Sequence, residues 1–281
     1  MGAATIDPPV VDAHAHIFTP DMPAADSAWF KPDYAYTASD YLEDLDAHGV
    51  HFGVIAGISI YGQYNDYMIE ELRRQPRLRG TVNIVPTTDR YVLERMRDDG
   101  IVGVRLQLSR RKELPDLASE DYRLLLRRVA DLGWHVHLAL EGAQMPAVLP
   151  ALEASGVRIV LDHFAHPDQN EGLANAGFQA VLRSIAKGRT WVKFSAGYRL
   201  TWLSKREGSP DPRAMQLARE AAAKLLQEAG PERLLWGSDA PFVGHEKSLT
   251  YADTLASFAE WVPDAKVRRR MTDTALQLYF S

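Results

Sequence analysis

The sequence predicts a single (β/α)8 barrel of the TIM type, in which parallel strands alternate with helices. Short apolar or β-branched runs alternate with amphipathic stretches of helical length, and strict alternation of this kind produces a parallel sheet. Eight such units favour closure into a barrel over an open doubly wound sheet, which is the main alternative. The length of 281 residues also suits one barrel, which typically takes roughly 250 residues. We therefore treat residues 1–281 as one domain.

Turn residues and helix caps delimit the elements in chain order. The predicted strands are Val10–Ala13, Gly53–Ile58, Gly80–Val85, Val102–Leu106, Trp134–Leu140, Arg158–Leu161, Trp191–Phe194 and Leu234–Trp236. Thr37 followed by Asp40 has the pattern of a helix N-cap with an acid three positions on. Gly49 lies where that helix would stop. Further predicted helices cover Glu120–Leu132, Pro212–Ala229 and Tyr251–Trp261.

Two connections are long, Ile17–Tyr36 after the first strand and Ser195–Asp211 after the seventh. Both leave the carboxyl ends of strands, where barrel active sites lie. Both carry aromatic residues, among them Trp29, Phe30, Tyr34, Tyr36, Tyr198 and Trp202. We expect these two loops to cover a bound substrate.

Composition excludes several classes of function. The net charge is −5 and no Lys/Arg-rich run stands out, so nucleic acid is not an expected partner. The chain has no cysteine, which excludes disulfides, thiolate metal ligands and a cysteine nucleophile. No basic segment followed by an apolar core opens the sequence, and the longest apolar stretch is far shorter than the ~20 residues of a membrane span. We expect a cytoplasmic protein without a membrane partner, and its oligomeric state stays open.

Histidines and one aspartate follow three of the predicted strands. His14 and His16 end the first strand, and residues i and i+2 of a strand face the same side. His163 ends the sixth strand, and Asp239 follows the eighth in a Gly-Ser-Asp-Ala-Pro turn. Because these ends meet at the mouth of a parallel barrel, we expect the four side chains to converge there.

Other polar residues near these positions are expected to have supporting roles. Asp12 and Asp162 each precede a histidine, and neighbouring strand residues point to opposite faces. His137 on the fifth strand is either a further metal ligand or, as we favour, a core histidine.

The motifs Val-Val-Asp-Ala-His-Ala-His, Leu-Asp-His-Phe and Leu-Leu-Trp-Gly-Ser-Asp-Ala-Pro occur in this order. Together they resemble those of the amidohydrolase superfamily, and within it the branch of 2-pyrone-4,6-dicarboxylate lactonases. The resemblance spans nearly the whole chain. It implies that Asp239 is the base that activates water. It also implies that His14, His16 and His163 polarise the carbonyl under attack, either directly or through a metal ion.

The residues leave two versions of this chemistry open. Three histidine nitrogens and the Asp239 carboxylate are suitable ligands for one Zn²⁺ or Mn²⁺ ion. Without a metal, ionised Asp239 is the base and protonated imidazoles stabilise the oxyanion. The bridging lysine of many superfamily members is not evident on the fourth strand, which speaks against a binuclear centre.

Arginines mark the substrate side. Arg105 and Arg111 end the fourth strand, and Arg199 lies on the loop after the seventh. The resemblance implies that they bind substrate carboxylates, for which the planar guanidinium is suited. The alternative is that they are solvated surface arginines. The resemblance also implies substrate contacts from Tyr36, Ser59 and Tyr61.

The chain departs from the lactonase pattern at two positions. His166 replaces an arginine that the family often has, and the fifth strand lacks a tyrosine of the lactonases. We count His166 as a substrate contact. Both departures favour a smaller or less charged lactone than a pyrone dicarboxylate.

The sequence therefore predicts a hydrolase that opens a small anionic lactone, one that bears a carboxylate. The alternatives are a sugar-lactone hydrolase or isomerase and a metal-dependent decarboxylase of the same superfamily. The decarboxylases commonly begin with Glu-x-His, so His14 speaks against them. A catalytically inactive barrel acting as a binding protein is a further alternative, which the intact His14, His16, His163 and Asp239 disfavour.

Overall fold

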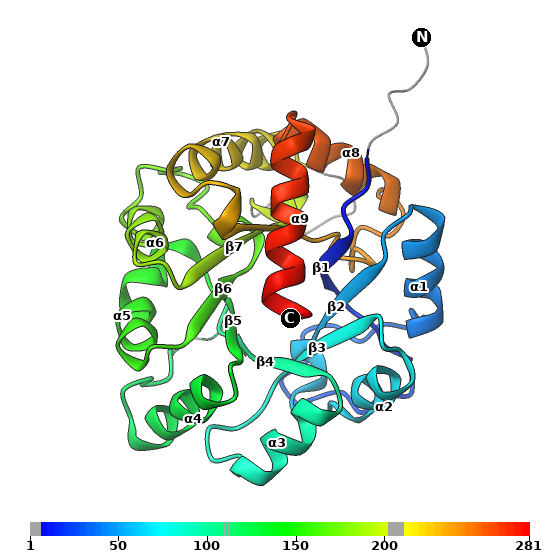
Figure 1. Cartoon of the computed structure of the whole chain (residues 1–281), viewed down its shortest axis with the longest axis vertical. Helices are drawn as coiled ribbons and strands as arrows, with labels where there is room; N and C mark the ends of the chain where they lie inside the picture. Colours follow the sequence, from blue (N-terminus) through cyan, green and yellow to red (C-terminus); the bar gives the residue numbers. More distant parts are fainter. Residues whose placement is uncertain (1–6, 110, 112, 202–210) are drawn as a thin grey trace.

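The computed structural model describes residues 7–109, 111, 113–201 and 211–281. Its strands form one eight-stranded parallel sheet in the order β1 to β8, and helices surround the sheet as a ring (Figure 1). The barrel closes where β8 returns to β1, because the backbone N–H of His16 donates to the carbonyl of Ala240 at 2.8 Å. The predicted (β/α)8 barrel is confirmed.

The strands lie close to their predicted positions. They are β1 (Val11–Ala15), β2 (Phe52–Ala56), β3 (Leu78–Val82), β4 (Ile101–Gln107), β5 (His135–Ala139), β6 (Arg158–Leu161), β7 (Thr190–Phe194) and β8 (Leu234–Trp236). The predicted third strand extends too far, to Val85. The structure ends β3 at Val82 because the backbone N–H of Asn83 turns to the side chain of Asn65, at 3.3 Å, and leaves the sheet.

The helices follow the strands in alternation. They are α1 (Ala38–Ala47), α2 (Asp66–Arg74), α3 (Arg90–Asp98), α4 (Glu120–Asp131), α5 (Met145–Ser155), α6 (Ala176–Ala186), α7 (Pro212–Ala229), α8 (Tyr251–Trp261) and α9 (Ala265–Tyr279). The predicted cap of the first helix is present, since the side chains and backbones of Thr37 and Asp40 bond reciprocally. These short-range contacts set the start of α1.

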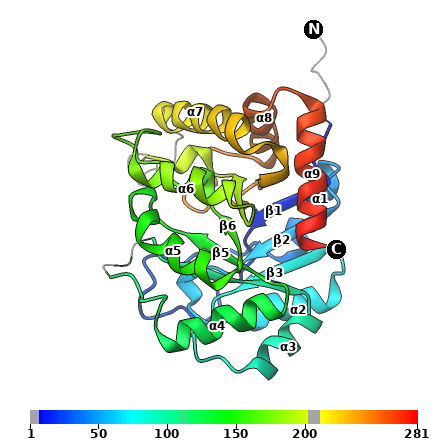
Figure 2. The same cartoon turned by 60° about the vertical axis from the view of Figure 1, so that its left-hand side comes forward.

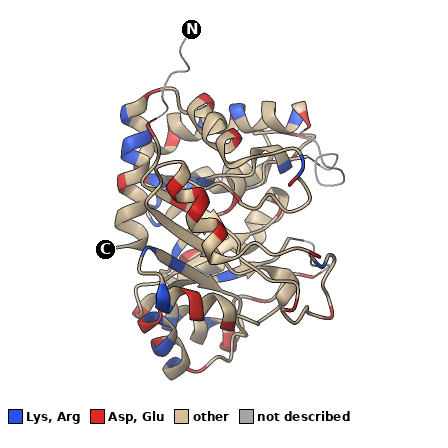
Figure 3. Cartoon of the chain, turned by 90° about the vertical axis from the view of Figure 1, so that its right-hand side faces the viewer, with Lys and Arg blue, Asp and Glu red and all other residues tan. Residues whose placement is uncertain are grey.

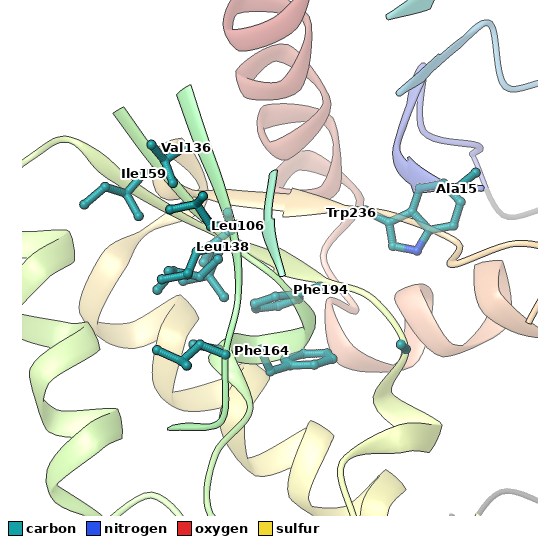
Figure 4. Packing of buried hydrophobic residues seen from close by; sticks show 14 of the residues in the cluster. Ala15, Leu106, Val136, Leu138, Ile159, Phe164, Phe194 and Trp236 are labelled. Atoms are coloured by element: carbon teal, nitrogen blue, oxygen red, sulfur yellow. The ribbon is translucent and has the colours of Figure 1, made fainter. Parts of the chain in front are cut away.

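The space between the sheet and the helices is apolar. Val136 and Leu138 of β5, Ile159 of β6 and Phe194 of β7 all face this layer (Figure 4). The rings of Phe194 and Phe164 stack with centroids 4.8 Å apart. Because strand residues alternate in direction, the residues between these apolar ones face the inside of the barrel and are free to be polar.

The amino end of the barrel is closed. Inside it, Val11, Ala13, Val54, Val160 and Leu235 form a buried apolar cluster with residues of α9, which we call the floor. Helix α9 lies across this end of the barrel (Figures 1 and 2). The floor separates the interior of the barrel from its amino end, and active sites of such barrels lie at the opposite, carboxyl end.

Charged residues of both signs are mixed over the helices on the face drawn in Figure 3. Within the described ranges, no helix combines the length and the apolarity that crossing a membrane requires.

Candidate active site

Strand β1 brings two histidines to the inside of the barrel mouth. Its pairing with β2 shifts register between Asp12 and Ala15. Below the shift, Ala13 faces inward as part of the floor; above it, His14 and His16 face inward. An irregularity of this kind restarts the alternation of side chains and re-aims those that follow.

The four residues predicted to form the reaction centre lie together. The Nε2 atoms of His14 and His16 are 3.3 Å apart. Oδ1 of Asp239 lies 3.5 Å from His14 Nε2 and 3.7 Å from His16 Nε2. His163 Nε2 is 3.9 Å from the same oxygen. We call this set the outer group.

The opposite nitrogen of each ring has its own partner. The Nδ1 atoms of His14, His16 and His163 bond to Asp162 Oδ1 at 3.0 Å, Ala56 O at 2.8 Å and Ser195 Oγ at 2.8 Å, respectively. A carbonyl and a carboxylate only accept, so Nδ1 carries the proton in His14 and His16. Their Nε2 lone pairs then face Asp239.

Burial lowers the pKa of all three imidazoles. The value for His16 falls to about 3, with the nearby Arg105 as the next cause, and those of His14 and His163 fall well below the ordinary range. The rings are therefore neutral near pH 7, the form that binds metal ions.

Asp239 is held from one side only. Its Oδ2 accepts from the Tyr198 hydroxyl at 2.6 Å and from Arg199 Nε at 3.0 Å. Burial raises the pKa of Asp239, although Arg199 and Tyr198 oppose the rise. Oδ1 stays directed at the histidines. Arg199 was expected to bind substrate, but the structure pairs its charge with Asp239, because Arg199 lies close behind β7 and also bonds to the carbonyl of Val243, which follows Asp239 in the chain.

A strained turn positions the end of β6. His163, Phe164, Ala165 and His166 all have positive φ, between 46° and 60°, which is costly for residues with a side chain. Asp162 was expected to face away from His163, and this was wrong. Strand β6 ends at Leu161, so strand alternation no longer applies, and both side chains reach the inside of the barrel.

Asp162 is the centre of a buried network below the outer group. It bonds to His14, to His137 Nε2 and to Arg105 Nη2, the last at 3.0 Å. Burial opposes its ionisation, yet its neighbours, His137 and His14 first, hold the pKa of Asp162 well below its usual value. His137 belongs to this network and also bonds to Thr81 at 2.9 Å, as favoured for a core histidine.

Sequence reasoning missed Lys193 on β7. Its Nζ lies 3.0 Å from His137 Nε2, 3.3 Å from His14 Nδ1 and 3.6 Å from Asp162 Oδ1. Its side chain is completely buried, and burial lowers its pKa to about 8. A single lysine in the apolar run Trp191–Phe194, at an inward position, was the available signal.

A cavity of about 600 Å³ opens above the outer group. Its lining includes the predicted residues His16, Ser59, Arg105, Arg111, His163, His166, Arg199 and Asp239, together with Trp29, Gln107 and Glu141. Trp29 comes from the first long loop, as expected of a covering segment. Trp202 of the second loop lies outside the described residues. Gln107 was missed, although it follows Arg105 at the inward spacing of two.

The structure does not bring Tyr36 or Tyr61 into this cavity. The Tyr36 hydroxyl donates to Asp44 at 2.6 Å. Tyr61 packs beside Phe18, with ring centroids 6.4 Å apart. Both rings fill apolar space between loops and helices, which explains why their positions near strand ends were misleading. We remove both from the candidate substrate contacts.

The amidohydrolase family model matches residues 11–280. The chain belongs to the amidohydrolase family. This amidohydrolase is 26% identical over 282 residues to 2-pyrone-4,6-dicarboxylate hydrolase of Comamonas testosteroni, a match that covers 96% of this chain and 90% of that protein. It is 26% identical to D-galactarolactone isomerase of Agrobacterium fabrum, with 92% and 87% covered.

A solved structure shows the same architecture. The protein from Acinetobacter baumannii, described as a probable 2-pyrone-4,6-dicarboxylic acid hydrolase with citric acid bound, superimposes on this amidohydrolase with a TM-score of 0.90. The two chains are 29% identical, and the match covers 96% of this chain and 98% of the other.

Proposed function

We propose that this amidohydrolase opens a lactone that carries a carboxylate, by adding water to the ring ester. One observation supports this proposal most directly. Three neutral histidines, His14, His16 and His163, meet Asp239 at the base of a cavity, and only one carboxylate oxygen of Asp239 is bonded to Tyr198 and Arg199. The Comamonas relative acts on a pyrone dicarboxylate by its name, which places lactone hydrolysis within the chemistry of close family members.

The outer group fits one divalent metal ion. The ligand atoms of His14, His16 and Asp239 lie 3.3 to 3.7 Å apart, close to the separation of about 3.3–3.6 Å between ligands bonded at about 2.0–2.2 Å to a tetrahedral ion. His163 Nε2 lies 3.9 Å from Asp239 Oδ1 and is the fourth ligand in this proposal. His14, His16, His163 and Asp239 would hold Zn²⁺ or Mn²⁺. The ion would supply a Lewis acid for the carbonyl and increase the acidity of water.

The protein's own groups complete the chemistry. Asp239 Oδ1 is directed at the reaction centre and takes the proton of the attacking water, while Tyr198 and Arg199 hold its other oxygen. A metal-free version would need protonated imidazoles to stabilise the oxyanion. Burial opposes protonation of all three rings, and therefore we favour the version with a metal.

The arginines indicate how the substrate is oriented. Arg105 bonds to Asp162 and to the Gly57 carbonyl, and Arg199 bonds to Asp239. Arg111 is exposed at the cavity, and among the described residues no carboxylate pairs with it. We therefore assign the substrate carboxylate to Arg111, with His166 nearby on the lining. Within the described residues of the lining, only Arg111 has a guanidinium with no carboxylate partner, which fits a lactone with a single carboxylate better than a dicarboxylate.

Proton release from a panel of carboxylated and sugar-derived lactones tests the proposal. We expect one of them to release acid, and Asp239→Asn to lower kcat by about 10²–10⁴-fold, the usual contribution of a general base. Asp99→Asn is the matched control, since Asp99 also pairs with an arginine, Arg73, but at the surface. Chelation should abolish turnover, and added Zn²⁺ or Mn²⁺ should restore it.

Isomerisation of a sugar lactone is the second candidate, favoured by the Agrobacterium relative. NMR of the same reactions separates the two, because isomerisation shifts the ring ester without net release of acid. Activity that survives Asp239→Asn in folded protein would contradict both. Release of CO₂ from an aromatic acid would instead establish a decarboxylase.

A further inference from the structure

Two groups of side chains in the described part of the chain have the spacing of metal ligands. One is His14, His16 and Asp239, which belong to the outer group. The other is His14, His137 and Asp162, which we call the inner group. The groups share His14, which faces the outer group with Nε2 and the inner group with Nδ1. Both are buried, so something other than access must decide which one takes an ion.

The inner group already surrounds a cation. Nζ of Lys193 lies within 3.6 Å of all three of its ligand atoms, and the side chain has no exposed surface. An ion bonded to His137 Nε2 would lie within about 5 Å of this ammonium. In a dry interior, two cations at that distance repel strongly.

The ligand atoms of the inner group are also occupied. His14 Nδ1 and His137 Nε2 both bond to Asp162 Oδ1, and Arg105 holds Oδ2. One carboxylate thus faces two fixed cations, Lys193 and Arg105, so the inner group is positive before any metal arrives. The outer group contrasts with it, because its cation, Arg199, bonds to Asp239 Oδ2 and not to the ligand atoms. Asp239 Oδ1 is left to face the Nε2 atoms of His14 and His16.

We propose that Lys193 is a built-in cation that excludes metal from the inner group and so confines this amidohydrolase to one ion at the outer group. Asp162 Oδ1 accepts the proton of His14 Nδ1, which leaves Nε2 free for the outer ion, and Lys193 holds the same carboxylate oxygen at 3.6 Å. Lys193 is in this sense a positioning residue. The inference rests on the proposed metal ion at the outer group, but its test distinguishes failure of the inference from failure of the proposed function.

Metal content, measured by mass spectrometry after equilibration with Zn²⁺ and gel filtration, tests the inference without an activity assay. We expect one ion per chain in the wild type and no change in His137→Asn. In Asp239→Asn, Zn²⁺ affinity should fall roughly tenfold or more. In Lys193→Met/Asp239→Asn, an ion should bind again, at the inner group. Adding His137→Asn to this double variant should abolish that binding.

Other results would overturn the inference. They are two ions in the wild type, loss of metal in His137→Asn, or a folded Lys193→Met/Asp239→Asn protein that gains no ion. Should Lys193→Met fail to fold, two ions in the wild type or loss of metal in His137→Asn would still overturn the inference. A wild type without any ion would refute the metal-dependent part of the proposed function, whereas a gained ion in Lys193→Met would still support exclusion by Lys193.

Discussion

At the scale of residues, two buried aspartates show how partners set chemical roles. Asp162 and Asp239 are both almost fully enclosed. The pKa of Asp162 is held well below its usual value by histidines and Lys193, whereas burial dominates for Asp239 and raises its pKa. Asp162 is therefore a permanent anion that orients His14, and Asp239 is the carboxylate that can exchange a proton during turnover.

Tyr198→Phe tests this assignment. The Tyr198 hydroxyl donates to Asp239 and lowers the pKa of Asp239. Turnover requires ionised Asp239, so kcat falls as the pH drops through that pKa. Without the donor the pKa rises further, and the acidic limb of the kcat–pH profile should move to higher pH. Tyr36→Phe is the control, since that hydroxyl donates to Asp44 outside the cavity. An unmoved limb in Tyr198→Phe would contradict the assignment of Asp239 as the base.

At the scale of elements, the site depends on where β8 meets β1. The backbone N–H of Asp239 donates to His14 O at 2.8 Å, and the carboxylate of Asp12 accepts from Ser238. This close approach requires Gly237. A Cβ atom there would lie 2.6 Å from the Cβ of His14 and 2.8 Å from its backbone nitrogen. His14 and Asp239 can therefore come together only if residue 237, which faces the Cβ of His14, has no side chain.

Gly237→Ala should consequently displace His14. We expect kcat to fall by about 10²-fold, as for a misplacement of about 1 Å, and the free energy of unfolding to fall by about 1–3 kcal/mol. Gly156→Ala is the control, because it adds a Cβ atom that strains the backbone without displacing a side chain of the site. Gly156 has a φ of +74° but nothing within 4 Å of an added Cβ, so it should lose about 1–2 kcal/mol and keep its kcat. Equal kcat values in the two variants would show that the β8–β1 contact does not position His14.

At the scale of the whole molecule, stability and chemistry occupy opposite ends of the barrel. The floor and α9 close the amino end with apolar side chains, and the network of charged groups lies above them. Such a division is general for barrels. It allows the mouth to keep strained turns and buried charges that a less well-packed protein would not tolerate.

Leu278→Ala tests the division. Leu278 packs on the floor from α9, and its truncation should lower the free energy of unfolding by about 2–3 kcal/mol, measured by urea denaturation. Turnover per folded molecule should stay unchanged, because the described residues that line the active-site cavity do not include Leu278 or any floor residue. A matching loss of kcat would mean that the floor also positions the site.

The local pattern of the sequence determined the elements and the outer group. Short apolar runs that alternate with amphipathic helical stretches located all eight strands, and the capping pattern of Thr37 and Asp40 located the start of α1. His14, His16, His163 and Asp239 could be predicted to meet because the carboxyl ends of parallel strands share one edge. Each of these inferences needs only neighbouring residues and the symmetry of a barrel.

Tertiary structure alone decided what those residues bond to. Lys193 reaches His14 across 179 positions of the chain, and Arg199, just after β7, pairs with Asp239, just after β8. The turn that directs Asp162 inward follows the end of β6, where strand periodicity no longer applies. Tyr36 and Tyr61 pack away from the cavity because other residues of the fold, Asp44 and Phe18, provide their contacts. Hydrogen bonds and ion pairs depend on positions to within about an ångström, and only packing of distant elements sets positions that finely.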